Sequence, residues 1–240
     1  MPHTVKAYDD ELKRLSGDIL RMGGLAESQL VSAISALARR DRTLADAVIA
    51  GDKEIDKIEH DVESLATRLL ALRQPVASDL RLIVGSIKLA AEIERLGDYA
   101  KNVAKRSHAL GAVDPVRPAS AVPRMGALVS RMIKDALDAF ARRDAQRAYD
   151  VWRRDAEVDE MYNSIFRELL TYMMEDPRSI TPCTHLLFVA KNLERMGDHA
   201  TNMAEMIYYI VEGARLEDAR PKSDDTPMLA TPPLPPTGSA

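Results

Sequence analysis

The frame Glu-Arg-x-Gly-Asp-x-x-x-Asn occurs twice in this sequence, starting at Glu94 and again at Glu194, 100 positions later (194 − 94). Upstream of each copy, "LARRDRTLADAVIAGDKEID" at residues 37–56 aligns without gaps on "FARRDAQRAYDVWRRDAEVD" at residues 140–159. A break at Pro75 or Pro177 separates these segments from the frame. Because a period of about 100 residues is far longer than a solenoid repeat, the sequence indicates a duplicated domain.

Helical periodicity runs through each repeat. In the first 40 residues, apolar side chains recur in steps of three and four, which places them on one face of a helix: Tyr8, Leu12, Leu15, Ile19, Met22, Ala26, Leu30, Ala33 and Leu37. A second helix is predicted from the end of "RRD" to about Leu72, and a third from about Asp79 to Ala109, because Pro75 disfavours helix at the residue before it. Repeating this unit gives an all-α fold of two tandem three-helix bundles with six long helices.

The predicted boundaries follow from the proline-rich segments. Residues 1–111 form the first repeat, residues 112–124 a linker with three prolines, and residues 125–214 the second repeat. Residues 215–240 hold six of the thirteen prolines, and we expect this tail to be disordered.

Composition narrows the classes of function. The net charge of −4 and the lack of a strongly basic segment argue against nucleic-acid binding. Cys183 is the only cysteine, which excludes an intrachain disulfide and a thiolate metal site. The N-terminus has no apolar signal region, and no apolar stretch approaches 18 residues. We therefore expect a cytoplasmic protein that meets a membrane only through partners.

Paired acids are the strongest candidate for a functional site. Glu94 and Asp98 are four residues apart and share one helical face, as do Asp52 and Asp56 on the preceding helix. The second repeat carries the same two pairs, namely Asp155 with Asp159 and Glu194 with Asp198. Since the helices on either side of each proline turn should be antiparallel, the two pairs in each repeat are predicted to face one another at similar height.

Facing carboxylates repel unless a cation lies between them, which makes these eight acids candidate metal ligands. Oxygen-only ligands suit magnesium, manganese, calcium or ferric iron. The glycine beside each pair, Gly97 or Gly197, costs about 1 kcal/mol in a helix. A bare backbone there leaves room for the opposite helix or for an ion with its waters. The alternative stays open that the acids form a solvated helix face, which is the usual reading of one such pair.

Three polar residues extend the acidic stripe. Asn102 and Asn202 lie one turn beyond Asp98 and Asp198, and His60 lies one turn beyond Asp56. His60 is either a peripheral ligand or a polar surface residue. The second repeat has Asn163 in its place, which weakens the interpretation as a ligand.

The segments "RQPVASDLRLI", "VAKNLERMGDHATNMAE" and "MIYYIVEG", together with the Asp-x-x-x-Asp pairs, resemble the PhoU family of phosphate-transport regulators. The resemblance covers about residues 8–213. It implies two bundles related by a pseudo-two-fold axis, with metal ions such as iron, zinc, nickel, manganese or magnesium held by the acid pairs. It assigns ligand roles to Asp52, Asp56, Glu94, Asp98, Asp155, Asp159, Glu194 and Asp198, and ligand-orienting roles to Asn102 and Asn202.

The same resemblance implies a cytoplasmic adaptor, expected as a homodimer. Its implied partners are the ATPase subunit of the phosphate ABC transporter and a membrane histidine kinase, and its implied effect is repression of the phosphate-starvation response when phosphate is ample.

Two other functions compete with an adaptor. A ferritin-like di-metal enzyme would use Glu-x-x-His pairs, and this sequence has none. A phosphotransfer bundle would need a phosphorylated histidine, but the candidates His60 and His199 are not duplicated as the acids are. No group of nucleophile, base and orienting residue is recognisable, so we predict that the chain is not an enzyme.

Overall fold

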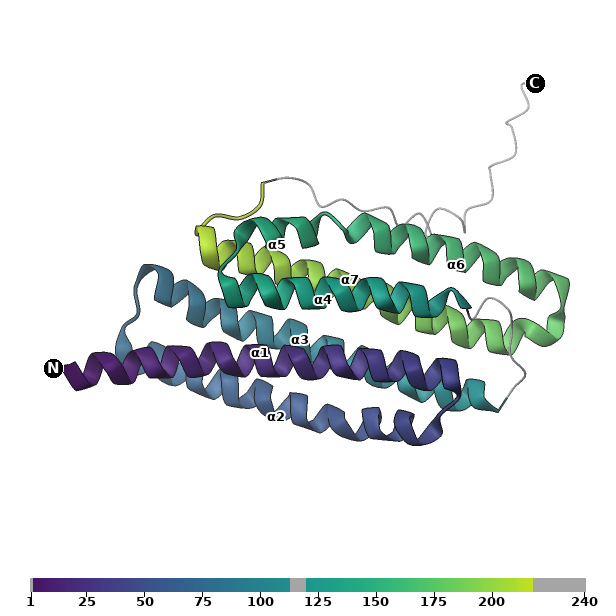
Figure 1. Ribbon diagram of the computed structural model, residues 1–240, viewed down its shortest axis with the longest axis horizontal. Coiled ribbons are helices and arrows are strands. Elements are labelled where there is room, and N and C mark those ends of the chain that lie inside the picture. Colours follow the sequence, from purple (N-terminus) through teal and green to yellow (C-terminus); the bar gives the residue numbers. More distant parts are fainter. Residues whose placement is uncertain (1, 113–119, 218–240) are drawn as a thin grey trace, which may run out of the picture.

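The computed structural model describes residues 2–112 and 120–217, and across these residues it contains helices and no strand (Figure 1). The helices in chain order are α1 (Pro2–Arg39), α2 (Arg42–Arg73), α3 (Ala77–Gly111), α4 (Val122–Arg142), α5 (Ala145–Trp152), α6 (Asp155–Glu175), the short 3₁₀ helix η2 (Pro177–Ser179) and α7 (Ile180–Glu212). The predicted all-α class is confirmed. None of the helices in the described part of the chain combines the length and apolar character that a bilayer span requires.

Two bundles lie side by side along their length (Figure 1). Helices α1, α2 and α3 pack together as the first bundle, and α4 to α7 pack together as the second. The bundles meet where α3 packs on α7 and α1 packs on α4, so α2, α5 and α6 lie on the outside. The predicted pair of tandem three-helix units is confirmed. Helix α4 begins at Val122, inside the segment expected to be linker, and most of that linker and of the expected tail lies outside the described residues.

The repeated "ARRD" segment makes the same turn in both halves. Arg40 and Arg143 have positive φ angles of 56° and 53°, which ends the preceding helix in the left-handed region. The next residue caps the following helix: the carboxylate of Asp41 accepts from the backbone N–H of Leu44, and that of Asp144 from the N–H of Arg147, both at 3.0 Å. The start of the second helix in each repeat is therefore encoded locally.

One helix departs from the repeat. Helix α2 is continuous, whereas its counterpart is interrupted at Arg153 and Arg154, which form a turn between α5 and α6. The guanidinium of Arg154 donates to Asp135 on α4 at 2.8 Å, which fixes the turn against the neighbouring helix. As a result, Asp155 lies in the first turn of α6, while the matching Asp52 lies inside α2.

Reciprocal contacts show the pseudo-two-fold relation of the halves. Gly126 on α4 faces Ile34 on α1, and a Cβ placed on this glycine would be 2.8 Å from the Cγ1 of Ile34. Gly23 on α1 faces Leu137 on α4 in the same way. Each glycine and each aliphatic residue has its counterpart 103 positions away (126 − 23, 137 − 34). The two halves therefore exchange equivalent contacts, as subunits of a symmetric dimer do.

Candidate functional site

The glycine of each repeated frame lies where two helices come closest. A Cβ on Gly97 of α3 would be 2.9 Å from Cδ1 of Ile55 on α2 and 3.4 Å from Oδ1 of Asp52. A Cβ on Gly197 of α7 would be 2.9 Å from Cγ1 of Val158 on α6. Both apolar partners are fully buried. Of the two reasons expected for these glycines, the structure shows the close approach of the opposite helix.

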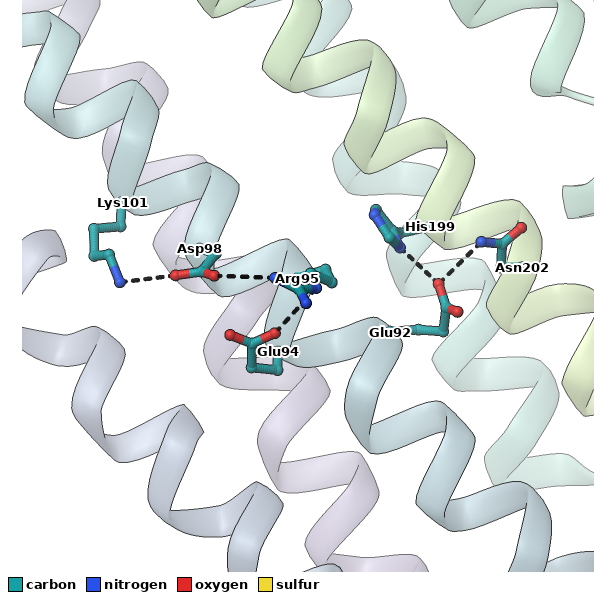
Figure 2. Close-up of polar contacts among 7 residues, drawn as sticks. All are labelled: Glu92, Glu94, Arg95, Asp98, Lys101, His199 and Asn202. Carbon is teal, nitrogen blue, oxygen red and sulfur yellow. Dashed lines mark hydrogen bonds and ion pairs between the residues drawn. The ribbon is translucent and has the colours of Figure 1, made fainter.

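In the first bundle, a lysine lies between the two acid-bearing helices. The ammonium of Lys101 on α3 bonds to Oδ2 of Asp52 on α2. It also bonds to Oδ1 of Asp98 at 2.8 Å, and Figure 2 shows this second contact. Asp52 is buried, with 6 % of its side chain exposed. Burial disfavours the charge on Lys101, but the hydrogen bonds to the two carboxylates outweigh it and raise the pKa of the ammonium. The facing acids are thus joined through a positive charge supplied by the chain.

Glu94 and Asp98 influence each other's pKa on the same face of α3. Burial, followed by the hydrogen bond to Asp98, raises the pKa of Glu94 to about 7. Burial also opposes ionisation of Asp98, yet hydrogen bonds from Lys101 and Glu94 lower its pKa overall. The exposed Arg95 lies 3.5 Å from Glu94 and 3.7 Å from Asp98, which adds a screened ion pair at the rim (Figure 2).

The second bundle buries its acids more deeply. Asp155 and Asp159 on α6 and Glu194 on α7 are 2 %, 4 % and 6 % exposed. The hydroxyl of Thr201 lies 3.1 Å from Oδ1 of Asp155 and also 3.1 Å from the carbonyl oxygen of Gly197. Lys191 donates to Oε1 of Glu194 at 2.8 Å. Buried carboxylates are costly unless they are neutralised, and Lys191 supplies one positive charge to this cluster.

The surroundings of the eight predicted metal ligands differ between the bundles. Within the described residues, no group of three or more His, Cys, Asp and Glu side chains is arranged to hold a metal ion. In the first bundle Lys101 lies between Asp52 and Asp98, so those residues do not fit a metal as they stand. In the second bundle the four carboxylates offer only oxygen donors and three of them are buried, while Oε1 of Glu194 accepts from Lys191. Asp56 and Asp198 are only half-buried in their respective clusters.

Two of the three residues expected around the ligands have identified contacts. Asn202 donates from Nδ2 to Oε2 of Glu92 at 3.0 Å, and Nδ1 of His199 lies 2.6 Å from the same oxygen, so these two residues link α7 to α3 across the bundle interface (Figure 2). His60 is exposed, and its Nδ1 lies 2.7 Å from the backbone oxygen of Asp56. Asn102 is half-buried on α3.

Sequence reasoning missed two residues of this region. Lys101 follows Asp98 by three positions, a spacing that puts both on one helical face and could have indicated their contact. Glu92 gave no signal, because its partners His199 and Asn202 are more than 100 positions away.

Comparison with known proteins shows to which family the chain belongs. The model of the PhoU domain family matches residues 19–107 and 122–207, one match in each bundle. A phosphate-specific transport system accessory protein PhoU homolog from Caulobacter vibrioides (strain NA1000 / CB15N) is 55 % identical, covering 92 % of this chain and 97 % of that protein. A homolog of the same description from Rhizobium meliloti (strain 1021) is 49 % identical, over 95 % and 97 % of the two chains.

Two crystal structures have the same fold. PhoU from Pseudomonas aeruginosa superposes with a TM-score of 0.84 at 42 % identity, covering 86 % of this chain and all of that one. The phosphate transport system regulatory protein PhoU from Streptococcus pneumoniae gives a TM-score of 0.81 at 30 % identity, covering 88 % and 99 % of the two chains. With both bundles matched by the family model and relatives aligned along nearly their whole length, the chain belongs to the PhoU family.

Proposed function

We propose that this protein is a cytoplasmic adaptor that couples the phosphate ABC transporter to a sensor histidine kinase, represses the phosphate-starvation genes and restrains phosphate uptake when phosphate is ample. The observation that carries the proposal is the family match in both bundles, together with relatives described as accessory proteins of the phosphate-specific transport system. The partners proposed are the ATPase subunit of the transporter and the kinase, and the proposed assembly is a homodimer.

A role without catalysis is supported by how the polar groups are used. Lys101, Asp52 and Asp98 satisfy one another inside the first bundle, and His199 is bonded to Glu92 at the interface. A phosphotransfer histidine would have to be accessible, and of the two earlier candidates only His60 is exposed. Replacing His60 by alanine is expected to leave regulation intact.

Regulation is tested by deleting the gene in a strain that has no second copy. In rich phosphate, the deletion strain is expected to express alkaline phosphatase, and a plasmid copy is expected to restore repression. If the enzyme stays repressed after deletion, the regulatory role is wrong. Co-purification of the full chain with the tagged ATPase subunit and, separately, with the tagged kinase tests the two partners.

We also propose that a metal ion binds at the second cluster, held by Asp155, Asp159, Glu194 and Asp198. The support is chemical: the donors are all oxygen atoms, and the burial of three of them favours a nearby cation. Elemental analysis of protein purified without added metal tests this, with Glu194→Gln as the variant and Glu212→Gln, at the exposed end of α7, as the control. Metal content is expected to fall in the first variant only, and an unchanged content would remove the assignment.

A further inference from the structure

The first acid cluster contains a cation that belongs to the chain. Lys101 reaches from α3 to Asp52 on the facing helix and at the same time to Asp98 on its own helix. The side chain of Lys101 is 23 % exposed and that of Asp52 is 6 % exposed, so the contact is largely shielded from water. An ion pair with this geometry interacts much more strongly than a pair at the surface.

The second cluster has a neutral group at the matching position. Thr201 lies 100 positions after Lys101, and Asp155 lies 103 positions after Asp52. The hydroxyl of Thr201 contacts Asp155 as the ammonium of Lys101 contacts Asp52, so the contact between the two helices is kept while its charge is not. The duplicated fold therefore provides an internal comparison, because the position that faces the equivalent aspartate carries a positive charge in the first bundle and none in the second. The ammonium of the second cluster, that of Lys191, is bonded to Glu194 instead.

We infer that Lys101 is the resident cation of the first cluster and takes the place of a metal ion there. A divalent ion between Asp52 and Asp98 would meet the ammonium at the position where both carboxylates already bind it, and the two positive charges would repel. The lysine is part of the chain, so its positive charge is present in every molecule, whereas a metal ion is present only when it is supplied. The contact between α2 and α3 at this cluster is therefore independent of metal.

This inference rests partly on the proposed metal site in the second bundle, and the experiment separates the two. The full-length protein is treated with EDTA, and its melting temperature is compared with those of Lys101→Thr and Lys105→Thr. The first variant installs the residue found in the second bundle, and the second makes the same change at an exposed lysine one turn away. Lys101→Thr is expected to melt roughly 5 °C or more below the wild type, because it leaves Asp52 buried without its ammonium, whereas Lys105→Thr is expected to match the wild type.

A second variant keeps the test decisive if Lys101→Thr folds poorly. Combining Lys101→Met with Asp52→Asn removes both charges at once, and this pair is expected to recover most of the loss caused by Lys101→Met alone. Manganese is then added to each protein. It is expected to raise the melting temperature of Lys101→Thr by more than that of the wild type, since a free cation replaces the missing one.

Two results would overturn the inference. One is an EDTA-treated Lys101→Thr variant that melts with the wild type. The other is a manganese-dependent rise in the wild type that Asp52→Asn abolishes, because the first cluster would then bind metal with its lysine in place. A manganese effect in the wild type that Glu194→Gln abolishes and Asp52→Asn does not supports the inference and the second-bundle site together. Loss of the second site alone leaves the stability comparison at Lys101 unaffected.

Discussion

The two repeated glycines, Gly97 and Gly197, allow a quantitative prediction, because an alanine at each position would contact a different neighbour. In a helix interior, alanine is favoured over glycine by about 1 kcal/mol. At Gly97 the added Cβ would meet the terminal Cδ1 of Ile55 at 2.9 Å, and this methyl can rotate away. At Gly197 it would meet Cγ1, Cγ2 and Cβ of Val158 at 2.9, 3.3 and 3.4 Å. A β-branched side chain in a helix has one strongly preferred rotamer, so Val158 cannot yield without moving α6.

The two substitutions should therefore change the free energy of unfolding by different amounts or in opposite directions. Overpacking a well-packed core costs about 1–3 kcal/mol. At Gly197 this cost exceeds the helical gain, and we expect Gly197→Ala to lower the free energy of unfolding by up to about 2 kcal/mol, or roughly 4–8 °C in melting temperature. Gly97→Ala is expected to be neutral or slightly stabilising.

Urea unfolding followed by far-ultraviolet circular dichroism measures both effects. The matched control is Gly197→Ala combined with Val158→Ala, which removes the obstructing methyl groups. We expect the double variant to lose at least about 0.5 kcal/mol less free energy of unfolding than the sum of the losses in the two single variants, because the two residues are in contact. Equal stabilisation by alanine at both glycines would refute the reasoning, because it would mean that the helices separate at no cost.

Three further measurements follow from the polar and buried groups. Because the pKa of Glu94 in the folded protein is raised above that of the unfolded chain, folding favours its protonated form, so stability is expected to fall as pH rises from about 4.5 to about 7; Glu94→Gln should flatten this part of the stability–pH curve. The thiol of Cys183 is fully buried and burial raises its pKa, so Ellman's reagent is expected to react with it only after unfolding, and rapid reaction of the native protein would contradict its placement. Trp152 donates from Nε1 to Glu205 at 2.9 Å, so Trp152→Phe is expected to cost about 1 kcal/mol or more in urea unfolding, whereas Glu205→Gln, which keeps an acceptor, should cost less.

The features that local chemistry determines were predictable from sequence. The capping aspartates Asp41 and Asp144 fix where the second helix of each repeat begins, and the prolines at 75 and 177 fix where it ends. The spacing of the acids from those turns predicts that Asp52 and Asp98 lie at the same height along the bundle. In the structure, Lys101 bonds to both of them. Such features depend on a few neighbouring residues and on the regular rise of a helix.

Other features depend on which side chains the tertiary fold brings together. The repeat predicted a continuous helix through Arg153 and Arg154, yet the chain turns there, and Arg154 binds Asp135 on a different helix. The resemblance to the PhoU family implies a ligand-orienting role for Asn202, and sequence alone gave no indication that its amide contacts Glu92 in the other bundle. Periodicity identifies the face of a helix on which a residue lies, and it does not identify the helix that packs against that face.

The reciprocal packing of Gly23 on Leu137 and of Gly126 on Ile34 bears on how such a molecule arises. Each repeat carries a glycine and an aliphatic side chain, and the aliphatic side chain of one repeat packs on the glycine of the other. Two separate copies of a single repeat would therefore already have self-complementary surfaces. When the two copies are joined in one gene, their pairing no longer depends on protein concentration. The two sequences can also change independently of each other. Each is then free to acquire its own chemistry, as a lysine in one copy and a threonine in the other illustrate.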